Sequence, residues 1–477
     1  MFLALFAMAA LPIWQVHTLP LFDYPNHLAR MHILASDTPE LQRFYAVNWR
    51  IVPNLAMDLI VPTLNTFLPL EVAGRIFIML TMASVVGSVA FLHRVLFQHW
   101  SPWPLLGFAL LYNRFMLWGF LNFLFGTGLA IAALGWWIGW RERSPRLCVA
   151  IACVLGVAVF LSHLAAFGCY AIALGAYELD QMRRRPGAIA TRAALAALPF
   201  VAPALLFVTG PSGAGGAIVF SRFLRKFDLP YSLFNNYTPP LDAVTMILFV
   251  ALFLIGLWRG WLRFAPSMQA PLIALVAAYL VMPNQIYTAS SVDHRLPLVI
   301  ALIAIGGSDL SQGLRWSRAI ACFAVMLFIA RMVVISVEWQ GFDRQYTSAR
   351  AALDSLPVGS RIAVATPDDG LRIRSGEAPM VHFPCWAIID RDAFVPTLFA
   401  YPTQQPVGFK PGYSDQPSAS ALWSALVTKD ASATLPPSLD AYDYVVLAAP
   451  TGFDVAERPG WVPEYQSPLF RIYRLLH

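Results

Sequence analysis

The stretch LPLFDYPNHLAR, from Leu19 to Arg30, places three side chains that can do chemistry directly after an almost wholly apolar chain start. Asp23 carries a carboxylate, His27 follows it by four residues, and Arg30 closes the segment. A carboxylate can take the proton of an attacking hydroxyl group, and residues four apart share one face of a helix. His27 is therefore placed to orient Asp23 or to meet a substrate; the alternative is an interfacial histidine without such a task.

A structural role for Asp23 competes with the catalytic one. Pro25 suits the first turn of a helix, and an aspartate just before that turn is a favoured N-cap and interacts well with the helix dipole. The two roles predict different results for Asp23→Asn. Asparagine caps helices about as well as aspartate, but it cannot accept a proton as a general base does.

Two further segments place cationic side chains next to apolar runs. The segment 221–240 contains Arg222, Arg225 and Lys226, whose spacing places them near one helix face, where they can bind the phosphate of a donor. The alternative is attraction to lipid headgroups. The segment 290–298 contains the consecutive residues Asp293, His294 and Arg295.

An arginine such as Arg295 can bind a phosphate through two parallel hydrogen bonds, whereas a pair of Asp293 with Arg295 at a helix start is the structural alternative. Ser162 and His163 interrupt the apolar stretch 147–179. Ionisable groups inside a membrane usually face a cavity or a partner, so His163 is a candidate for donor binding. A bend between two helices, with a satisfied histidine, explains the pair equally well.

The composition shows where these side chains must lie. The chain has 477 residues, 58% of them hydrophobic and 13% charged, against about 25% charged in soluble domains. A membrane crossing needs roughly 20 apolar residues, and the sequence predicts eleven crossings, some of them short. They are 2–21, 72–92, 103–112, 117–140, 147–163, 164–179, 193–210, 241–258, 269–283, 296–310 and 319–338.

The loop charges predict an orientation for these crossings. Basic residues occur in every loop that follows an even-numbered crossing, which places those loops in the cytoplasm under the positive-inside rule. The N-terminus is then cytoplasmic and the C-terminus extracytoplasmic. Residues 1–20 lack a basic start and a small-residue cleavage site, so they are predicted to remain as the first helix. The positive charge lies in short loops and does not indicate nucleic-acid binding.

The predicted fold is an α-helical polytopic membrane module, residues 1–340, followed by a small soluble α/β domain, residues 341–477. Residues 22–71 form a long first outer loop whose amphipathic stretches HLARMHIL and AMDLIVPTLNTFL are expected to lie at the membrane interface. Strands are predicted at 361–366, 442–449 and 469–476, and a helix at 348–356. The glycine-rich segment 210–216 is interpreted as the hinge of a substrate loop.

This architecture resembles the GT-C superfamily of membrane glycosyltransferases, which includes protein mannosyltransferases and aminoarabinose transferases. The run Asp23-Tyr24-Pro25-Asn26-His27 is similar to the start of the first outer loop in many bacterial members. The resemblance implies that an acceptor hydroxyl attacks the anomeric carbon of a sugar on polyprenyl phosphate, with Asp23 as the base. Relatives often carry two adjacent acidic residues, but Tyr24 follows Asp23 here. No cofactor is predicted, and a divalent cation has no support.

The leading hypothesis is a glycosyltransferase (EC 2.4) in a bacterial inner membrane, whose partners are a polyprenyl-phosphate sugar donor, a lipid, glycan or protein acceptor, and membrane lipids. The predicted donor-binding residues are His27, Arg30, His163, Arg222, Arg225, Lys226, Asp293, His294 and Arg295. A flippase or transporter of lipid-linked saccharides is an alternative, but repeated halves and polar residues at mid-membrane are not evident. An O-antigen polymerase or ligase is another alternative, although such proteins do not ordinarily have a C-terminal α/β domain.

Overall fold

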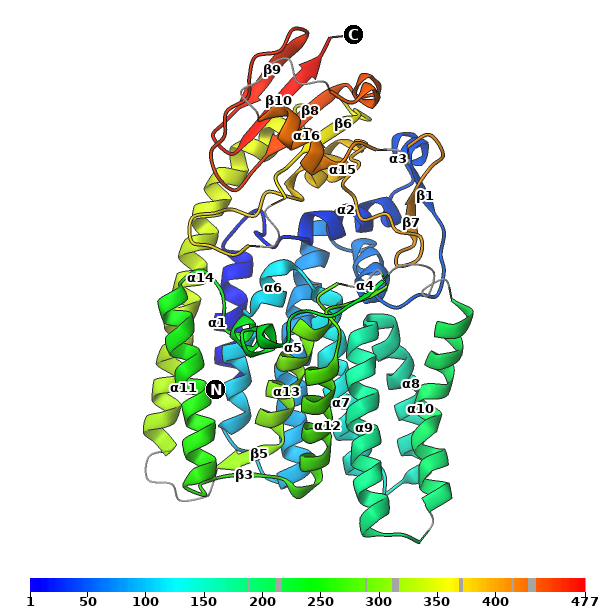
Figure 1. Ribbon diagram of the computed structural model, residues 1–477, viewed down its shortest axis with the longest axis vertical. Helices are drawn as coiled ribbons and strands as arrows, with labels where there is room; N and C mark the ends of the chain where they lie inside the picture. The colour runs from blue at the N-terminus through cyan, green and yellow to red at the C-terminus, as the bar shows by residue number, and fades with distance from the viewer. Residues whose placement is uncertain are drawn as a thin grey trace.

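The computed structural model describes residues 1–187, 189–210, 217–287, 290–310, 317–368, 372–413, 416–427 and 435–476. A helical bundle carries a smaller, sheet-containing domain on one of its ends (Figure 1). We call this the domain end of the bundle and the opposite end the loop end. The predicted fold class, a helical membrane module with a small C-terminal α/β domain, is confirmed.

Long apolar helices build the bundle. Six of the helices in the described residues are long and apolar enough to cross a membrane, and two shorter apolar helical segments, Phe2–Trp14 and Pro266–Val281, accompany them. The bundle helices are α1 (Phe2–Trp14), α5 (Leu70–Phe97), α7 (Leu121–Trp140), α8 (Pro145–Ser162), α9 (Leu164–Arg184), α10 (Ile189–Thr209), α11 (Pro239–Trp258), α12 (Gln269–Val281), α13 (Val292–Gly306) and α14 (Ser317–Asp354).

The segment predicted as the third crossing has a different structure. Residues 103–110 form the short 3₁₀ helix η1 (Trp103–Leu110), and α6 (Arg114–Trp118) follows it. Asn113 caps α6 by accepting hydrogen bonds from the backbone N–H groups of Phe115 and Met116. Eight residues of 3₁₀ helix span about 16 Å, which is too short for a hydrocarbon core of about 30 Å.

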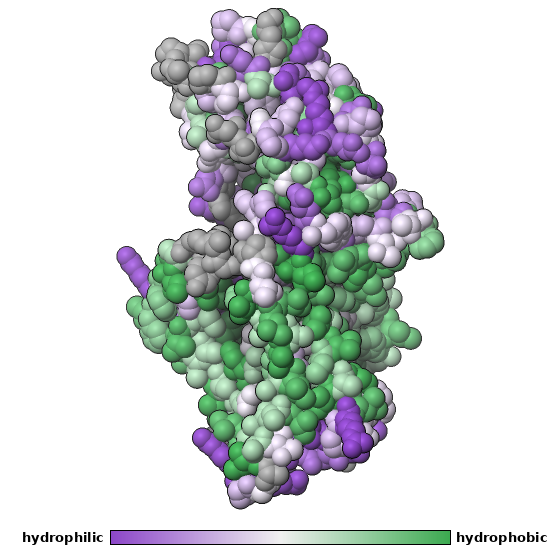
Figure 2. Space-filling view, turned by 90° about the vertical axis from the view of Figure 1, so that its right-hand side faces the viewer, coloured by the Kyte–Doolittle hydropathy of each residue, from purple (hydrophilic) through white to green (hydrophobic). Residues whose placement is uncertain are grey.

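The surface of the bundle matches its predicted environment. On the face shown in Figure 2, a broad apolar band covers the helices, and hydrophilic side chains gather on the C-terminal domain and at the loop end. Inside the bundle, α5 and α7 pack closely because Gly128 has no side chain. A Cβ atom there would lie 2.6 Å from the carbonyl carbon of Ser84. Small residues of this kind let membrane helices approach each other.

The first outer loop folds into α2 (Tyr24–Ala35), α3 (Pro39–Phe44), the strand β1 (Tyr45–Val47) and α4 (Ala56–Asn65). Helix α2 runs crosswise over the domain end of the bundle (Figure 1). The C-terminal domain covers it, because its short helices η6 (Phe383–Cys385) and α15 (Trp386–Arg391) pack on α2. In addition, β1 pairs with the strand β7 (Val407–Phe409) in an antiparallel register of Tyr45 with Phe409. Most of α2 is therefore buried between two parts of the chain.

The C-terminal domain is built on a four-stranded mixed sheet. Its order is β6–β8–β10–β9, with β6 parallel to β8 and the other neighbours antiparallel. The strands are β6 (Ile362–Ala365), β8 (Tyr444–Ala448), β9 (Trp461–Gln466) and β10 (Phe470–Leu475), and the short helices are η6 (Phe383–Cys385), α15 (Trp386–Arg391), α16 (Ala419–Leu426) and η7 (Pro437–Ala441). The three predicted strands are confirmed, and β9 is an addition. The helix predicted at 348–356 is instead the end of α14, which runs through the 340/341 boundary into this domain.

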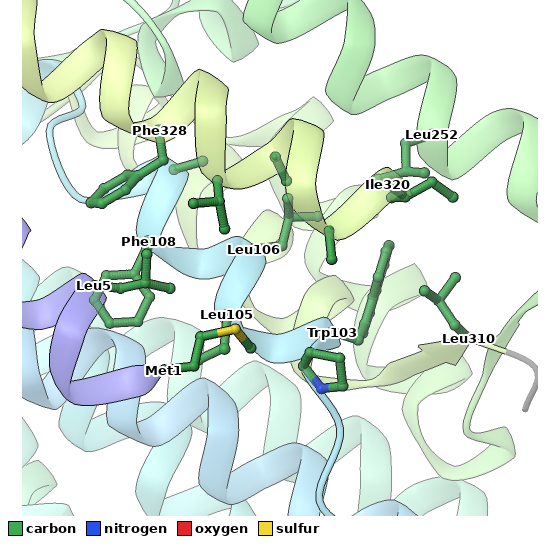
Figure 3. Close-up of a pocket in the computed structure, with 15 residues that line it drawn as sticks. Met1, Leu5, Trp103, Leu105, Leu106, Phe108, Leu252, Leu310, Ile320 and Phe328 are labelled. Atoms are coloured by element: carbon green, nitrogen blue, oxygen red, sulfur yellow. The ribbon is translucent and has the colours of Figure 1, made fainter. Parts of the chain in front are cut away.

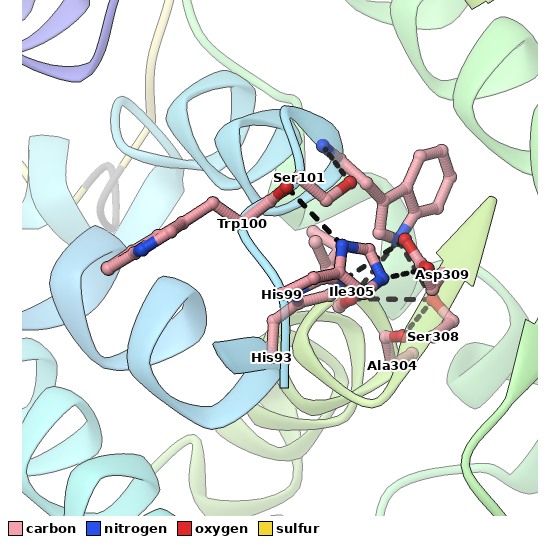
Figure 4. Close-up of polar contacts among 9 residues, drawn as sticks. His93, His99, Trp100, Ser101, Ala304, Ile305, Ser308 and Asp309 are labelled. Atoms are coloured by element: carbon pink, nitrogen blue, oxygen red, sulfur yellow. Dashed lines mark hydrogen bonds and ion pairs between the residues drawn. The ribbon is translucent and has the colours of Figure 1, made fainter. Parts of the chain in front are cut away.

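Short elements close the two ends of the bundle. At the domain end lie η3 (Phe223–Phe227), η4 (Leu229–Leu233) and the paired strands β2 (Ala217–Val219) and β4 (Gln285–Tyr287). At the loop end, η5 (Pro266–Met268) precedes α12, and β3 (Leu262–Phe264) pairs with β5 (Ser308–Leu310). The side chains of His93 and His99 both contact Asp309 there, at 3.1 and 2.9 Å (Figure 4). These contacts tie the end of α5 to β5.

Candidate active site

Asp23 lies at the domain end, at the junction of the first bundle helix and α2. Its backbone N–H donates to the carbonyl of Trp118 at 3.0 Å, and the N–H of Phe22 donates to that of Leu117. Gly119 has a φ of +85°, and a Cβ atom there would lie 3.2 Å from the Cβ of Asp23. Because glycine alone adopts this conformation without strain, Gly119 lets the α6–α7 turn fix the position of Asp23.

The carboxylate of Asp23 does not cap α2. In this fully described segment it makes no hydrogen bond to the N–H groups at the start of α2, although Asp23 occupies the N-cap position. Its Oδ1 instead lies 3.5 Å from Nε2 of His382, which comes from the C-terminal domain just before η6. Both side chains are largely buried, with 10% and 12% of their surfaces exposed. The hydrogen bonding expected of an N-cap is therefore absent from this helix start.

Burial sets the protonation of this pair. Desolvation raises the pKa of Asp23 from 3.8 to about 7, and the positive charge of Arg30 opposes that rise. Burial lowers the pKa of His382 to about 4, so this imidazole is neutral at pH 7. A carboxyl group with a pKa near the working pH suits general acid–base catalysis, because both of its protonation states are accessible.

The other two chemical residues of the opening stretch hold α2 in place. Arg30 donates to both carboxylate oxygens of Asp58 at 2.7 and 3.1 Å, and neither side chain is exposed. Nδ1 of His27 lies 3.3 Å from Nη1 of Arg30, and its ring packs against Phe399. Burial and the charge of Arg30 lower the pKa of His27 well below 6.5. The structure therefore places Arg30 and His27 in contacts within the protein.

The cluster of three cations predicted at 222–226 is divided in the structure. Lys226 points inward and contacts Asp293 at 3.0 Å, with its Nζ also donating to the carbonyl of Met282 at 2.8 Å. Arg222 and Arg225 are exposed. The prediction that all three share one face is wrong, because η3 has three residues per turn and aligns residue 222 with 225 but not with 226.

Asp293 pairs with Lys226 rather than with Arg295, so the expected Asp293–Arg295 pair does not form. Asn284 and Ser221 also donate to its carboxylate, at 3.1 and 3.2 Å. The guanidinium of Arg295 instead stacks over the rings of Phe120 and Phe123, at 5.2 and 5.7 Å from their centroids. Its Nη1 donates to the carbonyl of Ser290, while its Nε has no hydrogen-bond partner among the described residues.

Positive charge gathers around Arg295. His294 lies in the electrostatic field of the Asp293 carboxylate, 3.9 Å from its Nε2, and of Arg114, Arg225 and Arg295. Its buried Nδ1 has no partner within the described chain. Arg114 is held by the side-chain oxygen of Asn235 at 2.9 Å. This group, which we call the cationic cluster (Arg114, Arg225, His294 and Arg295), is joined to Asp23 through the turn Trp118–Phe120. Phe120 contacts Arg295, and Gly119 contacts Asp23.

His163 separates α8 from α9 and caps α9, since its Nδ1 accepts a hydrogen bond from the N–H of Ala165 at 3.1 Å. Its ring packs edge-on against Phe123, which also contacts Arg295. The predicted bend, with a histidine that is hydrogen-bonded within the protein, is thus present, and it lies beside the cationic cluster. The hinge predicted at 210–216 lies outside the described residues, except for Gly210.

Two cavities differ in their chemistry. One, of about 90 Å³, lies between α1, η1, α11 and α14 and is lined mostly by apolar side chains, among them Leu5, Phe108 and Phe328 (Figure 3). Its lining contains no acidic or basic side chain. A second, of about 160 Å³, is lined by Phe22, Val381, Arg372 and Arg374. It lies next to the Asp23–His382 pair, because Phe22 precedes Asp23 and Val381 precedes His382 in the chain.

The described residues contain no group of three or more His, Cys, Asp or Glu side chains placed to hold a metal ion. Two residues beside Asp23 were missed by sequence reasoning. His382 has no local motif, and Asn26 lies in the run 23–27 without a role assigned to it there; His382 lies more than 350 positions from Asn26 in the sequence. Only the docking of the C-terminal domain on α2 brings them together.

Comparisons with known proteins extend this description. No family model and no curated protein matches the sequence. Two solved structures of ArnT from Cupriavidus metallidurans match 99% of this chain and 97% of theirs. The apo structure gives a TM-score of 0.55 at 13% identity, and the structure bound to undecaprenyl phosphate gives 0.53 at 12% identity. This chain therefore has the fold of ArnT over nearly its whole length, as the resemblance implied.

Proposed function

We propose that this chain is a membrane glycosyltransferase that moves a sugar from a polyprenyl-phosphate donor to an acceptor hydroxyl group. The single observation that carries the proposal is the carboxylate of Asp23, buried at the domain end of an ArnT fold with a pKa of about 7. Undecaprenyl phosphate bound to one ArnT structure supports a polyprenyl-phosphate partner. The sugar and the acceptor depend on pocket walls from several loops.

The reaction assigns one role to Asp23. The acceptor oxygen forms a bond to the anomeric carbon while the bond from that carbon to the phosphate oxygen breaks. The polyprenyl phosphate leaves with the bonding electrons, and the acceptor proton passes to the carboxylate of Asp23. General-base assistance of this kind typically accelerates a reaction by about 10²–10⁴-fold. The neighbouring neutral His382 does not compete for the proton, because burial holds its pKa near 4.

The cationic cluster is the proposed site for the donor phosphate. Arg295 has an unpaired Nε, and His294 has an unpaired Nδ1, among the described residues. An unpaired buried donor such as the Nε–H of Arg295 costs free energy until a ligand accepts from it, and a phosphate offers several acceptor oxygens. The turn Trp118–Phe120 would then set the spacing between the phosphate and Asp23. Lys226 and Asp293 hold the segment that carries Arg225.

Asp23→Asn tests the proposal. Asparagine keeps the shape of the side chain and removes the proton acceptor, so the transfer rate at saturating donor should fall by about 10²–10⁴-fold. The matched control is Asp37→Asn, the same exchange at an exposed position of the same loop. A purified Asp23→Asn protein that retains more than about a third of the wild-type rate would end the catalytic proposal.

We further propose that the domain end faces the extracytoplasmic side of a bacterial inner membrane, as the basic loops at the loop end indicate. Cys385 cannot report this orientation, because it is fully buried. Asp454→Cys places a thiol on the exposed surface of the C-terminal domain, and Arg143→Cys places one in the exposed α7–α8 loop. A membrane-impermeant thiol reagent on intact spheroplasts should add label to the first variant only; the reverse result would invert the topology.

The same preparation separates the alternative functions. A flippase moves the lipid-linked saccharide without releasing polyprenyl phosphate, whereas a transferase releases one polyprenyl phosphate for each sugar transferred. Release that depends on Asp23 therefore supports the transferase. A polymerase or ligase acting on lipid-linked glycans would release a lipid pyrophosphate or phosphate only with an oligosaccharide donor.

A further inference from the structure

A chain of polar contacts joins α2 to the C-terminal domain next to Asp23. The side-chain oxygen of Asn26 accepts a hydrogen bond from the backbone N–H of Phe399 at 2.7 Å. Its amide nitrogen donates to the backbone carbonyl of Thr397 at 2.7 Å. Because backbone N–H and C=O groups cannot exchange roles, these two contacts fix the orientation of the amide. The nitrogen of Asn26 is therefore a donor toward its remaining neighbour.

That neighbour is the imidazole of His382. Nδ1 of His382 lies 3.1 Å from the amide nitrogen of Asn26, so Nδ1 must be the acceptor. A neutral imidazole carries one proton, which consequently resides on Nε2. Nε2 is the atom that lies 3.5 Å from Oδ1 of Asp23. The ring is held at this angle by an edge-on contact with Phe399, at 4.8 Å between centroids.

We propose that His382 is a positioning residue for Asp23: its Nε2–H, fixed by Asn26, is directed at Oδ1 and leaves Oδ2 to receive the acceptor proton. The C-terminal domain thereby supplies part of the active site. This inference rests on the proposed function, since it assigns a task to the same carboxylate. The separation of 3.5 Å is longer than a hydrogen bond, and contacts of this type commonly tighten when a substrate binds.

The other groups around Asp23 cannot take this part. Arg30 lies on the same helix, but its guanidinium is engaged by Asp58, and His27 contacts Arg30. The α6–α7 turn contacts Asp23 through the backbone of Trp118 and Gly119. Among the described residues, His382 is thus the side chain of the C-terminal domain that approaches this carboxylate, at 3.5 Å.

A purely structural role for His382 would be to dock the C-terminal domain on α2. His32 provides a matched control, because it lies on the same helix and its Nε2 contacts Asp392 of the same domain at 2.7 Å. Loss of His32 weakens the docking without touching Asp23. If His382 acts only in docking, the two histidines should behave alike when replaced.

The test is an infrared titration of the Asp23 carboxyl group in the full-length protein, identified by the band that Asp23→Asn removes. An N–H donor stabilises the ionised carboxylate, so His382→Ala should raise the titration midpoint by about 0.5–1 pH unit. His382→Gln retains an N–H and should show a smaller rise. His32→Ala should leave the midpoint unchanged. The measurement needs no substrate.

An unchanged or lowered midpoint in both His382 variants would overturn the proposal, as would an equal shift in His32→Ala. If His382→Ala does not fold, His382→Gln decides alone, with a raised midpoint as the supporting result. Failure of the proposed function would appear separately, as an Asp23→Asn protein with normal transfer. If the acid limb of the pH profile of the transfer rate shifts by the same amount as the infrared midpoint, the positioning role of His382 and the catalytic role of Asp23 are linked.

Discussion

Replacing Asp23 by asparagine should stabilise the fold, and the gain should depend on pH. The pKa of Asp23 is about 7 in the folded protein against 3.8 for a solvated aspartate, because burial disfavours its charge. The folded state therefore binds the proton more tightly than the unfolded state. Below pH 3.8 Asp23 is protonated in both states, and its burial costs no stability. As the pH rises from 3.8 to 7, the free energy of unfolding falls. Above pH 7 the loss of stability stays constant.

The magnitude follows from the difference of about 3 pH units at about 1.4 kcal/mol for each unit. Wild type should be less stable than Asp23→Asn by about 4 kcal/mol at pH 8 and by about 2 kcal/mol at pH 5. The asparagine oxygen can still accept from Nε2 of His382, so this contact is not lost. Few exchanges at a functional residue stabilise a fold by this amount.

Equilibrium unfolding in mixed detergent micelles at pH 5 and pH 8, followed by tryptophan fluorescence, measures the difference in the free energy of unfolding between wild type and variant. Asp37→Asn is the control, because it makes the same exchange at an exposed position of the same loop. A stability difference between wild type and Asp23→Asn that is equal at the two pH values would refute the raised pKa of Asp23. An Asp23→Asn protein that is less stable than wild type at pH 8 would refute it as well.

Two other predictions concern the geometry around this carboxylate. Gly119→Ala adds a Cβ at 3.1 Å from the backbone nitrogen of Asp23 at a φ of +85°, so it should cost about 1–2 kcal/mol of stability and lower the transfer rate on the order of 10²-fold by displacing the base. Gly87→Ala, where nothing lies within 4 Å, should leave the rate unchanged. Arg295→Ala should weaken donor use by about ten- to a hundredfold, and Arg295→Lys should restore it only in part. Arg143→Ala at the loop end is the control, and equal kinetics for the Arg295 and Arg143 variants would remove Arg295 from the donor site.

The sequence predicted the elements better than their contacts. Apolar runs and alternating strands are local patterns, so the strands at 361–366, 442–449 and 469–476 lie where they were predicted. The extent of α14 was not predictable in the same way. Its apolar part ends near 340, but the helix continues to Asp354 because it packs against α15 inside the C-terminal domain. Composition changes where the environment changes, and this change need not coincide with the end of a helix.

Residue types in the site were predicted where a single segment carries the signal. Asp23 stands out because a carboxylate ends an apolar run, and Arg295 stands out beside a crossing. The direction of a side chain is set by neighbours that are remote in sequence. Lys226 points inward because it forms an ion pair with the buried carboxylate of Asp293, 67 residues away in the sequence. In the same way, Arg30 is bound by Asp58 across the first loop. Periodicity alone carries no information about such partners.

Asp23 is costly to bury, and the contacts around α2 explain how the fold tolerates it. The Arg30–Asp58 pair and the β1–β7 strand pair hold the loop on the bundle, and the contact of His32 with Asp392 fixes α2 beneath the C-terminal domain. A rigid support of this kind allows a buried carboxyl group with a raised pKa to keep one position, which the proposed general base requires. A helix cap would need none of these contacts, because its own helix would supply the hydrogen bonds. The observed arrangement therefore favours a base that the C-terminal domain helps to hold, and it explains why α2 is covered rather than exposed at the membrane surface.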